Sequence, residues 1–271
     1  MPGVMQYFIW INYPILFMHV TRVLPSHYSP LATIDISKNK IAMAAAVVSF
    51  IVLFLTAIWL VAKFSAIFRP AALEGSGFSD ILTKTSEHTT FSFTLPLMTG
   101  IFLALVLVLL LHELVHGVFF WRLAGKRPEF NLKALGFYVA SPSDVYYPRN
   151  KYLTVGIAPL ILLTIIGLLL IVVVPAFFIP FLIFFVAFNA AGSAGDLIMI
   201  VLLLSYSPDT MRQDVGSSVI IYGPRKSFIS HRGKNWFCLP RPVMRHNFAF
   251  CSLWPKLPWV TSFIRRMLYQ Q

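Results

Sequence analysis

Four long stretches of the chain consist almost entirely of apolar residues, and polar residues gather between them. They cover residues 42–68, 95–121, 152–174 and 177–206. Each is long enough to cross a bilayer core of about 30 Å, which takes about 20 helical residues. Only helices satisfy their own backbone within lipid over segments of this length. The pattern predicts an all-α membrane protein with a four-helix transmembrane bundle, and the short link at Pro175 predicts a hairpin of the third and fourth helices.

Two shorter segments have a different pattern. Residues 130–145, between the second and third helices, mix aromatic and aliphatic residues with Gly136 and Pro142. This mixture is typical of short strands, and it predicts a strand-like loop at the membrane surface. Residues 211–222 follow the fourth helix, and residues 218–222 among them are strand-like.

Composition supports the membrane prediction, since 58% of the residues are hydrophobic and only 12% are charged. A soluble domain is about half apolar and about a quarter charged. The net charge of +12 comes mostly from residues 225–271, which contain nine of the 22 Lys and Arg residues and no acidic residue. The rest of the chain has 13 basic and 10 acidic residues, a balance of only +3.

These features divide the chain into three parts. Residues 1–41 form an expected peripheral segment at the membrane surface, because their apolar stretch is broken by Asn12 and Pro14. Residues 42–223 form the membrane domain, and residues 224–271 form a basic tail that we expect to be disordered. Cys238 and Cys251 lie in this tail without a C-x-x-C pattern, so both are expected to be free thiols.

The loop charges predict an orientation. The loop between the second and third helices contains six basic and two acidic residues, whereas the loop between the first and second helices is balanced. Cytoplasmic loops carry an excess of Lys and Arg. We therefore expect a multi-pass protein of the cell membrane with both termini in the cytoplasm.

The second helix contains the motif His112-Glu113-Leu114-Val115-His116. Histidines four residues apart lie on one face of a helix, where both can bind one zinc ion. Glu113 points about 100° away and is placed to act as a general base on water at the metal. A buried polar cluster that only joins helices is the alternative, but charged groups within an apolar helix are functional candidates by default.

The fourth helix supplies the expected third ligand, Asp196, its only ionisable residue. Counting from the cytoplasmic ends of the two helices places Asp196 within about 8 Å of the depth of His112 and His116. Small residues at 192–195 would let the helices approach closely. Asn189 shares the face of Asp196, and it is expected either to stabilise a substrate oxyanion or to make an interhelical hydrogen bond.

The motifs together resemble the bacterial family of putative zincin peptidases, small multi-pass proteins distantly similar to site-2 proteases. The resemblance covers roughly residues 80–222. It rests on the segments His112–Gly117, Gly136–Tyr138 and Ala158–Pro159, and on the pattern N-x-x-G-S-x-G-D that ends at Asp196. It implies that His112, His116 and Asp196 bind zinc and that Glu113 is the base. The chain lacks the L-D-G form of site-2 proteases, so their substrates and pathways do not transfer.

The expected function is zinc-dependent hydrolysis of peptide bonds in or near the membrane. A membrane metal-binding or transport protein and an inactive zincin-like scaffold remain as alternatives. The expected cofactor is Zn²⁺. The expected partners are the lipid bilayer and a membrane-associated protein or peptide substrate, with no nucleic acid.

Overall fold

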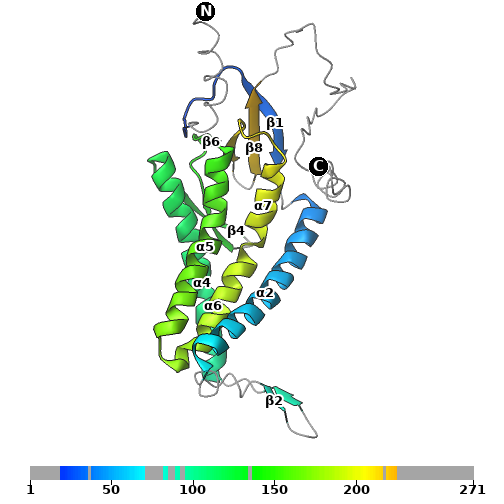
Figure 1. Ribbon diagram of the computed structural model, residues 1–271. Coiled ribbons are helices and arrows are strands. Elements are labelled where there is room, and N and C mark those ends of the chain that lie inside the picture. Colours follow the sequence, from blue (N-terminus) through cyan, green and yellow to red (C-terminus); the bar gives the residue numbers. More distant parts are fainter. Residues whose placement is uncertain are drawn as a thin grey trace, which may run out of the picture. The chain divides into compact units, whose positions relative to one another are not determined.

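The computed structural model describes residues 19–35, 38–70, 82–84, 89–91, 95–133, 136–215 and 218–224 (Figure 1). The expectations for the first 18 residues and for the basic tail after residue 224 lie outside these ranges. The chain separates into two compact units, one with the four-stranded sheet and one with most of the helical residues.

Four helical segments of the described chain are long and apolar enough to cross a membrane, as predicted. The first three are single helices: α2 (Lys40–Phe68), α4 (Leu95–Ala124) and α5 (Arg149–Val173). The fourth segment, Ala176–Leu204, comprises the 3₁₀ turn η3 (Ala176–Phe178), α6 (Ile179–Gly192) and α7 (Ala194–Leu204). The predicted fourth membrane segment is present, and within it a one-residue turn at Ser193 separates α6 from α7.

The ends of these helices follow from local chemistry. The side chain of Asn39 accepts hydrogen bonds from the backbone N–H groups of Ile41 and Ala42 at 3.0 Å each, and so caps the start of α2. Gly125 has a φ of 64° and follows the last residue of α4, the position where glycine commonly ends a helix. Pro175 separates α5 from η3.

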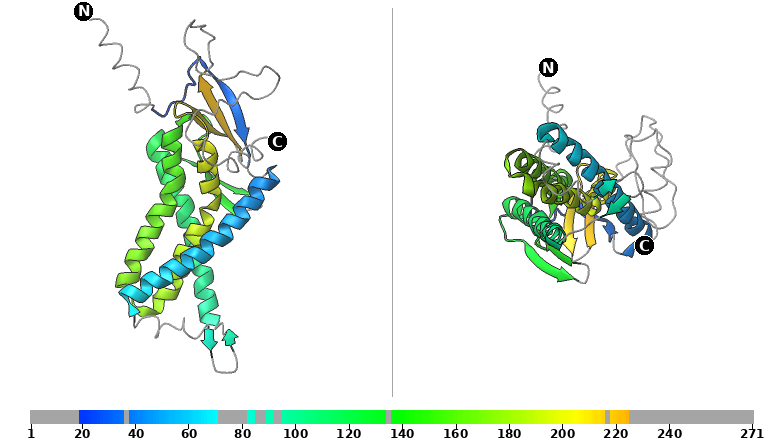
Figure 2. Two further views of the ribbon diagram at one scale, coloured as in Figure 1. Left: turned by 45° about the vertical axis from the view of Figure 1, so that its right-hand side comes forward. Right: turned by 90° about the horizontal axis from the view of Figure 1, so that it is seen from below.

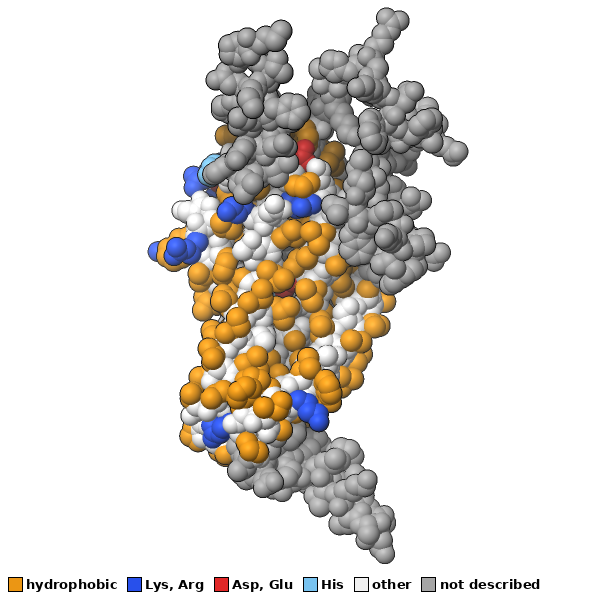
Figure 3. Space-filling model, in the orientation of Figure 1, with side chains coloured by type: hydrophobic (Ala, Val, Ile, Leu, Met, Phe, Trp, Pro, Cys, Tyr) orange, Lys and Arg blue, Asp and Glu red, His pale blue; other side chains and the backbone are white. Residues whose placement is uncertain are grey.

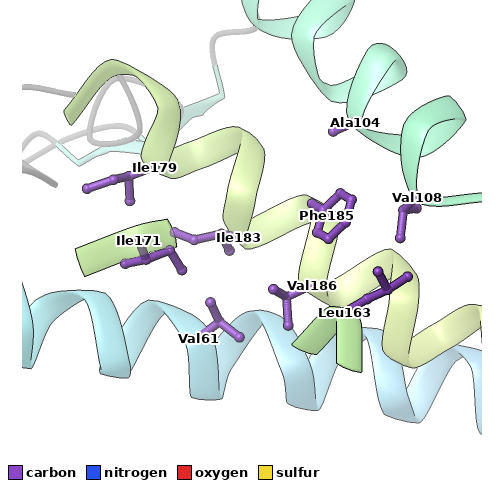
Figure 4. Close-up of a cluster of buried hydrophobic side chains, with 9 residues drawn as sticks. All are labelled: Val61, Ala104, Val108, Leu163, Ile171, Ile179, Ile183, Phe185 and Val186. Carbon is purple, nitrogen blue, oxygen red and sulfur yellow. The ribbon is translucent and has the colours of Figure 1, made fainter. Parts of the chain in front are cut away.

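The core of the helical unit is built around α6, which contacts all three long helices. Gly100 of α4 approaches the ring of Phe181, and Gly167 of α5 approaches Val186. The ring of Phe54 in α2 lies 5.1 Å from that of Phe188. Figure 4 shows the buried hydrophobic cluster, which consists of Val61, Ala104, Val108, Leu163, Ile171, Ile179, Ile183, Phe185 and Val186.

Much of the outer helical surface is apolar. Figure 2 shows α2 crossing the neighbouring helices obliquely, and its side chains include Val48, Leu55 and Trp59, each about 60% exposed. Hydrophobic side chains dominate the visible face of the helices in Figure 3. Exposed apolar surface of this extent suits a lipid environment and would be unfavourable in water.

The four-stranded sheet has the order β1-β8-β7-β6. Its strands are β1 (Tyr28–Ile34), β6 (Tyr147–Pro148), β7 (Met211–Val215) and β8 (Ser218–Pro224). All neighbouring pairs are antiparallel, and β7 and β8 pair from Met211 opposite Tyr222 to Val215 opposite Ser218. The strand predicted at residues 218–222 is thus present, whereas β1 lies in a segment for which no strand was predicted.

Two further strand pairs lie in the loops between helices. Strands β2 (Leu82–Lys84) and β3 (Thr89–Phe91) pair between α2 and α4. Strands β4 (Glu129–Lys133) and β5 (Gly136–Ala140) form a two-stranded sheet between α4 and α5. The latter pair is the strand-like loop that the sequence predicts between the second and third membrane helices.

Candidate metal centre

The two histidines of the H-E-L-V-H motif lie one turn apart on the same face of α4. Their side chains are only 9% and 10% exposed, and their ring centroids are 5.0 Å apart. Seventeen uncharged residues of α4 precede His112. The apolar sequence of α4 therefore places two basic nitrogen ligands in an interior with little access to water.

Asp196 reaches both histidines from the first turn of α7. Its Oδ2 atom lies 3.1 Å from Nε2 of His112 and 3.4 Å from Nε2 of His116. The break before α7 is held by the Ser193 hydroxyl, which donates to the backbone carbonyl of Asn189 at 2.9 Å. A carboxylate in the first turn is also favoured by the positive end of the helix dipole. The structure thus brings together the three residues that the sequence predicts as ligands.

The two glycines near Asp196 do not explain this proximity. A Cβ atom added to Gly192 or Gly195 would meet nothing within 4 Å. For these two glycines the expectation of a close helix approach is therefore wrong, whereas Ser193 and Ala194 are buried. The close approaches lie at Gly100 and Gly167, which contact side chains of α6.

Asn189, in the last turn of α6, orients His112. Its Nδ2 group has three acceptors nearby: the carbonyls of Pro159 and Leu160 at 3.2 and 3.3 Å, and Oγ1 of Thr164 at 3.3 Å. This fixes the amide so that Oδ1 faces Nδ1 of His112 at 3.1 Å. The oxygen can only accept, so Nδ1 of His112 carries the proton. Of the two expected roles, Asn189 makes the interhelical hydrogen bond.

His116 is oriented in the same way by main chain. Its Nδ1 atom lies 3.1 Å from the carbonyl oxygen of Val155 in α5. A carbonyl is only an acceptor, so Nδ1 of His116 is also the protonated nitrogen. The Nε2 atoms of both imidazoles face Asp196, and a tautomer with its proton on Nδ1 would leave Nε2 free to bind a metal ion.

This donor set fits a zinc ion. The two Nε2 atoms and a carboxylate oxygen lie within 4.8 Å of one another, so the three side chains could hold a metal ion together. Tetrahedral bonds of about 2.0–2.1 Å would place ligand atoms about 3.3 Å apart, and the two Nε2 to Oδ2 distances in the structure are 3.1 and 3.4 Å. Outer hydrogen bonds to ligand histidines are common at metal sites and set their orientation.

Glu113 lies between the two histidines in sequence and is half-buried on α4. Its side chain lies on a different part of the helix surface from the ligands, as expected for adjacent residues. The orienting groups were not predicted: the role of Asn189 was left open, and the Val155 carbonyl was not considered. Pro159 gave a usable signal, because a proline inside a helix leaves the carbonyl four residues earlier without its usual partner.

Comparison with known proteins finds one family model that matches part of the chain. No curated protein and no solved structure matches the chain. The family match and the cluster of His112, His116 and Asp196 together support a zinc peptidase in general. The resemblance inferred from the motifs is confirmed, since residues 105–211 match the model of the family described as "Putative zincin peptidase".

Proposed function

We propose that this chain is a membrane-embedded zinc peptidase in which His112, His116 and Asp196 hold the metal and Glu113 is the general base. The proposal rests above all on the convergence of two imidazole nitrogens and one carboxylate oxygen within 4.8 Å. Three protein ligands are typical of catalytic zinc, which keeps a fourth position for water or substrate.

The proposed chemistry divides between metal and side chains. Zinc, when bound, supplies Lewis acidity, which acidifies water and polarises a substrate carbonyl. Glu113 accepts the proton of the attacking water and passes it to the leaving amine. Asn189 and the Val155 carbonyl keep both Nε2 atoms available to the metal. The Asp196 side chain is 29% exposed, against 9% and 10% for the histidines, and this favours approach of water and substrate from the Asp196 side.

The proposed setting is the cell membrane. The four apolar helical segments fit a membrane protein, and the loop charges favour cytoplasmic termini. We assign the peptidase to residues 42–223, which include the whole family match. A membrane-associated protein or peptide is the proposed substrate.

The variant Glu113→Gln tests this function. In lipid nanodiscs, the purified wild-type protein should contain one zinc ion per chain by mass spectrometry of metals. It should also cleave peptides in a proteome-derived mixture, with new termini read by mass spectrometry. Glu113→Gln should keep its zinc and lose cleavage by roughly 10²–10⁴-fold, the usual contribution of a general base.

The control Glu129→Gln changes the same residue type outside the motif and should cleave as the wild type does. A wild-type chain without zinc would refute the metal site. Zinc without cleavage in the wild type would favour the metal-binding protein or the inactive scaffold. Equal cleavage by the wild type and Glu113→Gln would remove Glu113 as the base.

A further inference from the structure

Pro159 lies inside α5, four residues after Val155. In an α-helix the N–H group of each residue binds the carbonyl four residues earlier. Proline has no N–H group, and its ring crowds that same carbonyl. Pro159 therefore leaves the Val155 carbonyl without its usual helical donor.

The Val155 carbonyl accepts a hydrogen bond from His116 instead. Nδ1 of His116 lies 3.1 Å from the Val155 oxygen, at a position where both residues are buried. A buried carbonyl without a hydrogen bond would be unfavourable, especially in lipid. Proline is tolerated in membrane helices where a neighbouring side chain satisfies the freed group, and here His116 is that side chain.

The same turn of α5 also supports the second histidine. The carbonyls of Pro159 and Leu160 accept from Asn189, whose oxygen accepts from His112. Main-chain carbonyls of α5 thus support both imidazoles. The Val155 carbonyl does so directly, and those of Pro159 and Leu160 act through Asn189. The part of α5 that contains Pro159 therefore helps to orient both His112 and His116 through hydrogen bonds.

We propose that Pro159 is a positioning residue of the metal centre, acting through its missing N–H group. By withholding that donor it reserves the Val155 carbonyl for His116, which fixes the tautomer that presents Nε2 to the metal. This inference rests on the proposed zinc site and adds the residue that prepares it. Pro159 itself makes no contact with the metal or the substrate in this scheme.

The variant Pro159→Ala restores the competing N–H group. The new amide would compete with Nδ1 of His116 for the Val155 carbonyl and weaken the hydrogen bond that orients the imidazole. Loss of an outer hydrogen bond at a metal ligand typically weakens metal affinity by about 10–100-fold. We expect a loss of this size in zinc affinity, measured on the full chain in nanodiscs by competition with a chromophoric chelator.

A backbone ester separates this effect from loss of the proline ring. Lactic acid at position 159, introduced by nonsense suppression, has the alanine side chain but no N–H group. The ester variant should keep a zinc affinity within about threefold of the wild type. Pro159→Ala, in contrast, should bind zinc about 10–100-fold more weakly than the wild type. Pro180→Ala is the matched control, because Pro180 lies in the first turn of α6, where no helical donor is needed.

A spectroscopic readout addresses the tautomer directly. In metal-free protein with ¹⁵N-labelled histidine, one protonated Nδ1 signal should disappear in both Pro159→Ala and His116→Gln, and remain in the ester variant. Equal zinc affinity in Pro159→Ala and Pro180→Ala would overturn the proposal, as would an ester variant as weak as Pro159→Ala. Absence of zinc from the wild type would instead refute the proposed function.

Discussion

Arg212 of β7 is fully buried, and its guanidinium is only partly satisfied. Its Nη2 atom donates to the Leu203 carbonyl at 3.5 Å, and its charge lies 5.2 Å from the centre of the Tyr206 ring. Nε and Nη1 have no hydrogen-bond partner among the described residues. Burial lowers the pKa of Arg212 to about 9. The buried charge therefore costs stability at neutral pH.

Replacing this charge should stabilise the protein. Buried charges replaced by apolar side chains of similar size are often neutral or stabilising. We expect Arg212→Met to raise the apparent melting temperature in detergent by roughly 2–8 °C at pH 7.5. A lower melting temperature for Arg212→Met at pH 7.5 would show that the charge makes a stabilising contact.

The gain should depend on pH in a defined direction. Above pH 9 the unfolded chain keeps the proton that folded Arg212 has released, so wild-type stability rises with pH there. The difference between the variant and the wild type should therefore be largest near pH 7.5 and shrink above pH 9. Melting curves of both proteins at pH 7.5 and pH 10 measure it.

At this scale the sequence predicts the residues with distinctive chemistry. His112, His116 and Asp196 could be selected because ionisable groups are rare in apolar helices. The orienting Val155 could not, because it acts through its main-chain carbonyl and its side chain carries no signal. The position of Asn189 showed which face it shares with Asp196, but not which of its neighbours it would bind.

Among the elements, α6 depends on close contacts with α4 and α5. A Cβ atom on Gly167 would collide with Val186, which is only 2% exposed and has no room to move. Gly192, at the end of the same helix, faces open space. These two glycines form a matched pair that separates packing from helix propensity.

The substitutions Gly167→Ala and Gly192→Ala should have opposite effects. Overpacking should destabilise Gly167→Ala by about 1–3 kcal/mol, whereas Gly192→Ala should be neutral or gain about 0.5–1 kcal/mol from reduced backbone freedom. Apparent melting temperatures in the same detergent compare them. Equal melting of the two variants would contradict the role of Gly167 as a packing site.

Element boundaries were predicted less completely than element types. The four membrane segments were predicted from their length and apolar composition, but the turn at Ser193 was not, because residues 177–206 remain apolar through it. Strand β1 was missed because its pairing with β8 joins positions almost 200 residues apart, such as Tyr28 and Pro224. Strand pairing over such a distance leaves little local pattern.

At the scale of the whole molecule, labelling of cysteines can test which side of the membrane the termini occupy. Cys238 and Cys251 are the only two cysteines of the chain, and both lie in the basic tail. A membrane-impermeant maleimide should label them in inverted membrane vesicles and leave them unlabelled in intact cells, if the termini are cytoplasmic.

A variant with the opposite expected result controls for access. In Cys238→Ser/Cys251→Ser/Ser76→Cys, the single thiol lies in the loop between α2 and α4, and labelling should occur in intact cells. Labelling of the tail cysteines in intact cells would reverse the proposed topology while leaving the metal centre unaffected.

The pairing of His112 with Asp196 has a consequence for chain connectivity. The two residues are 84 positions apart, and a shared ion would close this part of the chain into a loop. Cross-links that close long loops restrict the unfolded chain, as disulfides do, but a metal cross-link opens whenever the ion is withdrawn. The ion that serves hydrolysis would thus also act as a reversible cross-link. The supply of metal would then control the stability of the fold as well as the activity.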